Sequence, residues 1–328
     1  MAEPFPDMVD PSHTPAEPAR PRPAWELALL YAAVAAWIAV WYGINSSTQE
    51  GTVGITPSSL ASSKFLDVIG LSFAALTPPL LVGGLVLWVG LLNAPNRLPP
   101  LRTTTALLLN GAVAALLIYQ LPSFAAGLIR GRVRVDSLGL FVLTSLVGGV
   151  LAYAWAQLVL GARGDGLRGL GWNVRSAIVR AVAGYVAMFP LVLGAFLITA
   201  LGLMAFPHVQ NPANPAAEWA TKAKPGQVPF IYIVACVIAP IVEELVFRGF
   251  VFRGLEKRYG VFVGALASAM IFAGMHPQMP FGFPPLVAFA FAMCYVYRAS
   301  GSLVPGMLIH AANNALVLTI ARLAMGGH

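Results

Sequence analysis

The sequence predicts an all-α protein, a polytopic transmembrane helix bundle of about eight or nine spans with a polar cavity inside the bilayer. The first observation is composition: 58% of the residues are hydrophobic and only 10% are charged, whereas a soluble domain carries about 25% charged residues. The second is that long apolar segments recur from residue 25 to the C-terminus. The third is that the last few segments contain acidic, basic and amide side chains, although a charge at the bilayer centre costs at least ~2.5–3.5 kcal/mol.

Three regions are expected along the chain. Residues 1–24 are rich in proline and have no apolar face, so we expect a disordered tail. Residues 25–177 hold N-terminal transmembrane spans, and residues 178–324 hold a core that contains the buried polar groups. The expected spans are 25–44, 69–92, 103–121, 138–160, 178–206, 230–252, 262–275, 285–298 and 302–324. The seventh and eighth are short for a bilayer of ordinary thickness.

The basic residues of the loops predict the orientation of the chain. Positive charges accumulate on the cytoplasmic side of membrane proteins. An N-terminus inside the cell places the larger group of Lys and Arg there: Arg20, Arg22, Arg97, Arg102, Arg163, Arg168, Arg175, Arg180, Arg253, Lys257, Arg258 and Arg298. Arg130, Arg132 and Arg134 oppose this orientation. The net charge of +7 is spread over loops without a basic tract, so no nucleic-acid partner is expected.

Three polar groups on different segments are expected at one depth in the membrane. Glu243 precedes a turn at Gly260 by 17 residues and His276 follows it by 16. At 1.5 Å per residue each lies about 24–26 Å from that turn. His310 lies about 14 Å beyond a second turn at Gly301. If the first turn projects about 10 Å beyond the hydrocarbon, the three groups share a layer.

Helical spacing separates the roles of the neighbouring side chains. Glu243 and Glu244 are adjacent, so they diverge by about 100° and are not expected to face one site squarely. Glu244 and Arg248 are four residues apart and are expected to form an ion pair, which leaves Glu243 for chemistry. His310 and Asn314 have the same spacing, so both can face one cavity.

These motifs, in this order, resemble the CAAX protease and bacteriocin-processing family of intramembrane endopeptidases. They are Glu-Glu-x-x-x-Arg (Glu243, Glu244, Arg248), Phe-x-x-x-His (Phe272, His276) and His-x-x-x-Asn (His310, Asn314). The resemblance covers roughly residues 178–323, and it leaves the role of the N-terminal spans open. Each motif alone is weak, but three in order on separate spans are specific.

The resemblance implies a peptidase whose catalytic residues are Glu243, His276, His310 and Asn314. Glu243 is then the general base, and His276 positions the water or shuttles a proton. His310 and Asn314 bind the oxyanion, while Glu244 and Arg248 support the site. A buried carboxylate and preorganised donors suit this chemistry.

A metal-dependent alternative stays open at this point. Glu243, His276 and His310 could ligate Zn²⁺ as in His₂Glu sites. An asparagine four residues after His310 suits an oxyanion donor better than a zinc ligand, so no cofactor is favoured.

The resemblance also implies the partners and the location. The substrate is a peptide or membrane protein, with two alternatives: a lipidated tail of the CAAX type, or a leader or tail that is processed. Membrane lipid is the other partner. The Ala-, Gly- and Arg-rich composition favours a bacterial cytoplasmic membrane. The alternative function is a non-catalytic scaffold or a transporter with a polar core; a transporter would be expected to show inverted repeats with broken helices.

Overall fold

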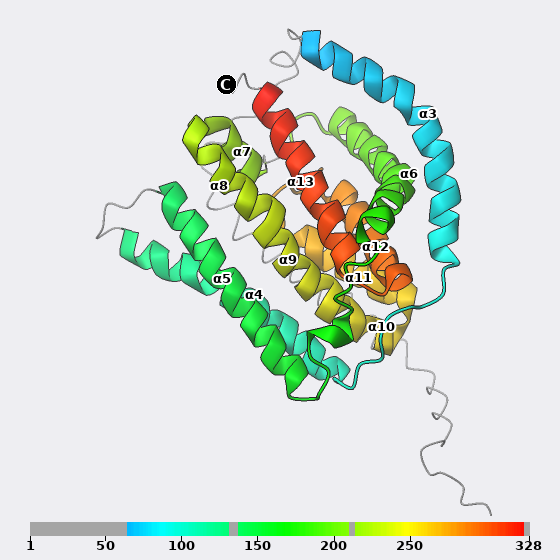
Figure 1. Cartoon of the computed structure of the whole chain (residues 1–328). Coiled ribbons are helices and arrows are strands. Elements are labelled where there is room, and N and C mark those ends of the chain that lie inside the picture. The colour runs from blue at the N-terminus through cyan, green and yellow to red at the C-terminus, as the bar shows by residue number, and fades with distance from the viewer. Residues whose placement is uncertain (1–63, 131–136, 210–213, 325–328) are drawn as a thin grey trace, which may run out of the picture.

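The computed structural model describes residues 64–130, 137–209 and 214–324 (Figure 1). The expected tail and the expected span at 25–44 lie outside these residues. The described part of the chain is helical throughout, which confirms the prediction of a polytopic helical bundle. Within it, six helical stretches are long and apolar enough to cross a membrane, namely Ala75–Leu92, Thr105–Ala126, Leu138–Gly161, Ala177–Ala205, Pro225–Tyr259 and Val304–Leu323.

The helices follow the expected spans closely. The spans expected at 69–92, 103–121 and 138–160 correspond to α3 (Lys64–Leu92), α4 (Thr105–Arg130) and α5 (Ser137–Gly161), and the span expected at 178–206 corresponds to α6 (Ala177–Ala205). A short α7 (Pro215–Lys222) is capped by the side chain of Asn214. The two short spans are α11 (Val261–Gly274) and α12 (Phe283–Ser300), and α13 (Val304–Ala324) closes the described chain. The short 3₁₀ segments η2 (Leu167–Leu170) and η3 (Pro225–Gln227) precede α6 and the sixth span.

The sixth expected span is a composite helix. It runs through α8 (Val228–Ile233), η4 (Val234–Ile238), α9 (Ala239–Glu243), η5 (Glu244–Phe252) and α10 (Arg253–Tyr259). Segments η4 and η5 are π-helical, with hydrogen bonds that span one residue more than in an α-helix. Figure 1 shows α8, α9 and α10 in line through the bundle beside α13.

Both hairpin turns lie where the sequence places them. Gly260 has a φ of 83° between α10 and α11, and Gly301 has a φ of 67° between α12 and α13. Glycine has no Cβ to oppose these left-handed values. The residue counts that estimate the depths of Glu243, His276 and His310 therefore begin at turns that the structure contains.

Several basic residues lie at one end of the bundle, where hydrogen bonds connect the ends of different helices. Arg253 and Lys257 donate to the carbonyl oxygens of residues in the α3–α4 linker, with Lys257 Nζ 2.9 Å from the oxygens of Leu101 and Thr103. The backbone amide of Arg97 donates to the oxygen of Arg298 at 3.1 Å. We call this end, where α3, α10 and α12 finish and α4, α6 and α13 begin, the basic end.

Asp165, in the loop after α5, fastens α5 to α4 at the basic end. Its carboxylate accepts from the backbone amides of Arg102 and Thr103 at 2.9 and 2.7 Å, and from the Thr103 hydroxyl. Burial alone would raise the pKa of Asp165, but these hydrogen bonds and nearby Lys257 outweigh it and lower that pKa. The Asp165 carboxyl is therefore held in its ionised form, which keeps these hydrogen bonds of the loop.

The N-terminal helices pack against the core. The α4–α5 hairpin lies against the composite helix, and α3 lies along α6 (Figure 1). A Cβ at Gly149 of α5 would lie 3.0 Å from the Ile238 side chain, and one at Gly84 of α3 would lie 2.6 Å from atoms of α6. These glycines permit the close helix contacts that replace hydrophobic packing in a membrane.

Candidate active site

Glu243 lies at the junction between two π-helical segments. It ends α9, with η4 five residues before it and η5 beginning directly after it. The irregularity has a local cause, because the Ala239 amide donates to Val234 five residues back and Pro240 has no N–H for the next carbonyl. Single π-turns inside helices occur often at functional sites.

Glu244 and Arg248 form the ion pair that their spacing predicts. Arg248 Nη1 lies 2.9 Å from Glu244 Oε1, and the two side chains are 0% and 1% exposed. The guanidinium also donates to the Ala290 carbonyl of α12 at 3.3 Å and lies 4.9 Å from the centre of the Phe272 ring. The pair therefore joins the composite helix to α11 and α12.

His310 contacts both glutamates. Its Nδ1 lies 3.1 Å from Glu244 Oε1, and its Nε2 lies 3.5 Å from Glu243 Oε2. The two glutamates diverge, as helical spacing predicts, and one imidazole contacts both carboxylates. A single imidazole has nitrogens on two edges, so it meets both carboxylates where they diverge.

Gly306 makes room for this arrangement one turn before His310. A Cβ at Gly306 would lie 2.9 Å from Glu244 Oε2. A contact that short forces a neighbour to move, and this neighbour is a buried carboxylate already held by Arg248. The glycine therefore lets α13 approach the glutamate pair.

Asn314 completes the same face of α13. Its Nδ2 donates to the carbonyl oxygen of Ala235 at 2.7 Å. That oxygen lies in η4 and has no helical donor of its own. The Ala239 amide donates to Val234 instead, and Pro240 has no N–H to donate. Asn314 therefore supplies the missing donor and fixes α13 to the π-helical segment, a contact that the sequence did not reveal.

His276 reaches the site from the end of α11. Its Nδ1 lies 2.8 Å from the Phe272 carbonyl oxygen, and the two rings lie 4.6 Å apart. A carbonyl oxygen can only accept, so a neutral His276 carries its hydrogen on Nδ1 and keeps Nε2 as an acceptor. His276 interacts electrostatically with Glu243, His310 and Arg248. The structure thus brings the side chains from the three motifs together.

Aromatic rings surround the two histidines. The Phe272 ring lies 5.8 Å from the His310 ring and 5.1 Å from that of Phe247, and the Phe289 ring lies 5.5 Å from His310 on another side. Such rings hold the imidazoles in place and lower the local dielectric. Charge interactions in the site are correspondingly stronger than in water.

Tyr119 is a neighbour of the site that sequence analysis missed. It lies in α4, outside the three motifs, yet its side chain interacts electrostatically with Glu243. Its backbone is close to α5, since a Cβ at Gly148 would lie 2.2 Å from the Tyr119 carbonyl oxygen. No pattern in the sequence marks this tyrosine, because its position depends on how the N-terminal hairpin packs.

The arrangement of donors does not fit the three-ligand zinc alternative. Within the described residues, no three His, Cys, Asp or Glu side chains form a metal-binding group. Both nitrogens of His310 face glutamates, so two of the three candidate ligands, His310 and Glu243, contact each other directly. No catalytic step is therefore assigned to a metal ion.

Comparisons with known proteins agree with the site. Residues 225–316 match the family model of the type II CAAX prenyl endopeptidase Rce1-like proteins, which confirms the resemblance of this segment. The matched residues include all three motifs. The matched segment is therefore similar to a CAAX-type intramembrane protease, within a chain whose described helices form a polytopic bundle.

A curated relative also matches this chain. The UPF0177 protein YxdF of Lactococcus lactis subsp. lactis (strain IL1403) is 27% identical over 92 residues, which is 27% of this chain and 50% of that protein. The match thus spans about half the length of the relative. No solved structure matches the chain.

Proposed function

We propose that the chain is an intramembrane endopeptidase in which Glu243 activates the water that attacks the scissile peptide bond. One observation carries this proposal: Glu243 lies 3.5 Å from His310 and interacts electrostatically with His276, while Arg248 is paired with Glu244. Glu243 retains 23% exposure of its side chain, against 1% for Glu244. Glu243 Oε2 is itself buried beside His310, so water would reach Glu243 at the exposed part of its side chain.

The proposed reaction is a general-base hydrolysis. Glu243 takes a proton from water as the water oxygen bonds to the carbonyl carbon, and the carbonyl oxygen becomes an oxyanion. His276 accepts a hydrogen bond from the water through Nε2 and so aligns it. The tetrahedral intermediate collapses as the C–N bond breaks, and the proton held by Glu243 passes to the leaving nitrogen.

His310 and Asn314 are the proposed oxyanion donors. Asn314 uses one amide hydrogen on Ala235, and its second hydrogen remains for the substrate. The His310 ring is held by Glu244, which accepts the Nδ1 hydrogen, so the proposed donation from Nε2 on the side of Glu243 requires the imidazolium form, with a hydrogen on each nitrogen. Donors fixed in this way act strongly in a site of low dielectric.

The substrate is proposed as a membrane-associated protein or peptide that is cut near one of its ends. CAAX-type tails with a lipidated cysteine and leader peptides both fit a site within the bilayer. The chain is proposed to lie in a bacterial cytoplasmic membrane with its N-terminus inside. The positive residues gathered at the basic end support that orientation.

A transporter or scaffold is the competing function. The composite helix is irregular, as transporter helices often are. It nevertheless continues as a helix through Glu243 rather than opening into an unwound segment. This difference favours the peptidase.

A comparison of peptide termini tests the proposed function. Membranes from cells that produce the wild-type chain or the Glu243→Gln variant are compared by terminal proteomics. At least one new terminus is expected with wild type and absent with Glu243→Gln. Glu218→Gln is the matched control, because Glu218 pairs with Lys222 in α7, away from the site. Identical termini in wild type and Glu243→Gln membranes, with equal amounts of protein, would reject proteolysis in favour of the scaffold or transporter.

A further inference from the structure

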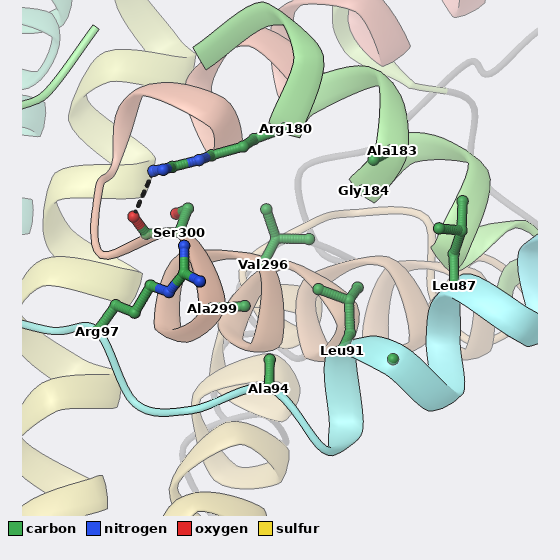
Figure 2. A pocket seen from close by; sticks show the side chains of 11 residues that line it. Leu87, Leu91, Ala94, Arg97, Arg180, Ala183, Gly184, Val296, Ala299 and Ser300 are labelled. Carbon is green, nitrogen blue, oxygen red and sulfur yellow. Dashed lines mark hydrogen bonds between the residues drawn. The ribbon is translucent and has the colours of Figure 1, made fainter. Parts of the chain in front are cut away.

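A cavity at the basic end is separate from the candidate active site. It has a volume of about 260 Å³ and lies between the end of α3, the beginning of α6 and the end of α12 (Figure 2). Its residues are Leu87, Gly90, Leu91, Ala94, Arg97, Arg180, Ala183, Gly184, Val296, Ala299 and Ser300. The volume corresponds to roughly eight or nine water molecules, enough for a small head group.

The polar part of this cavity is cationic. Arg180 donates from Nη1 to the Ser300 carbonyl oxygen at 2.7 Å. This bond uses one of the five N–H donors of the guanidinium, so the others can bind a ligand. Arg97 is exposed, and among the described residues its guanidinium has no hydrogen-bond or ion-pair partner. Figure 2 shows both side chains directed towards Ser300. No acidic residue lines the cavity, so the two guanidiniums face it without a counter-charge.

The remaining walls and their surroundings are apolar. Leu87 and Leu91 form one side and Val296 another. Next to the cavity, Val86 of α3 is 68% exposed and Val182 of α6 is 60% exposed. In a membrane protein such surfaces are covered by acyl chains. The cavity therefore lies where the head group and the hydrocarbon of a lipid meet.

We propose that this cavity binds an anionic phospholipid, with the phosphate held between Arg97 and Arg180 and the acyl chains along α3 and α6. Guanidinium groups bind phosphate oxygens in pairs and are weakly hydrated, which suits this contact. The bound lipid would join α3 to α6 and α12. The proposal is independent of catalysis.

The experiment measures lipid binding to the purified full chain in detergent. Native mass spectrometry follows the binding of phosphatidylglycerol and of phosphatidylcholine. We expect phosphatidylglycerol to bind more tightly, and Arg97→Gln to weaken it about fivefold, the effect of one basic residue near a lipid head group. Ala183→Phe, which fills the cavity and keeps both arginines, should also weaken it. Arg163→Gln is the matched control, because Arg163 is an exposed arginine of the basic end outside the cavity.

Three results would overturn the proposal. One is equal binding of the two lipids to the wild-type chain. Another is an equal loss in Arg97→Gln and Arg163→Gln, which would mean diffuse attraction to the basic end. The third is displacement of the lipid by inorganic phosphate at equal concentration, which would make the site one for free phosphate.

Discussion

Replacement of Arg248 by alanine is expected to destabilise the protein by about 3–5 kcal/mol, the usual cost of leaving a buried charge without its partner. Arg248 is 0% exposed and pairs with Glu244, which is 1% exposed. The change also removes the donor to Ala290 and the contact with the Phe272 ring. The measurement is thermal unfolding of the purified protein, together with its yield in membranes.

A double variant separates the charge effect from lost packing. The double variant Glu244→Gln with Arg248→Met removes both charges and keeps much of the side-chain volume. Its loss of stability should therefore be smaller than the summed losses of the two single variants. Arg175→Ala is the control, because Arg175 is exposed at the basic end and surface changes stay within about 0.5 kcal/mol. Strictly additive effects at 244 and 248 would contradict the ion pair as a stabilising unit.

Asn314→Ala is expected to lower kcat by about 10²–10³, the size of one lost oxyanion donor. The same change leaves the Ala235 carbonyl without its donor, so some loss of stability should accompany it. The two effects are separated by measuring kcat per folded molecule and the unfolding temperature in parallel. A loss of stability alone, with normal kcat, would restrict Asn314 to holding α13 against η4.

Chelation and metal analysis accompany this experiment. Activity should persist after treatment with a strong chelator, and Asn314→Asp should be at least as harmful as Asn314→Ala because it puts negative charge where negative charge develops. A zinc enzyme would behave otherwise. Its activity would follow bound metal, and His276→Ala or His310→Ala would lose both. Stoichiometric zinc that is lost and restored together with activity would contradict the proposed water activation.

Much of the core could be predicted because its signals are local. Gly260 and Gly301 mark the turns, and counting residues from them places Glu243, His276 and His310 at related depths, a placement that agrees with their convergence in the structure. The Glu244–Arg248 pair follows from helical spacing alone. Each of these signals needs only the order of residues and the geometry of a helix.

The missed contacts depend on tertiary packing. The π-helical segment η4 arises where Pro240 lacks its N–H and Asn314 of a distant helix supplies the replacement. The contact between His310 and Glu244 requires α13 to come close, which Gly306 permits. Tyr119 interacts electrostatically with Glu243 from a helix outside the matched segment. Spacing within one helix cannot reveal any of these.

Hydrolysis by the purified chain is the most direct test of the account. A synthetic peptide that spans the bond found by terminal proteomics is incubated with wild type or Glu243→Gln in proteoliposomes, and the rate and the unfolding temperature are measured together. Wild type should produce the two fragments, and Glu243→Gln should be slower by about 10²–10⁴, the contribution of a general base, with an unchanged unfolding temperature. An intact peptide after incubation with wild type, or cleavage by Glu243→Gln at the wild-type rate, would contradict the claim that this chain is a peptidase with Glu243 as its base.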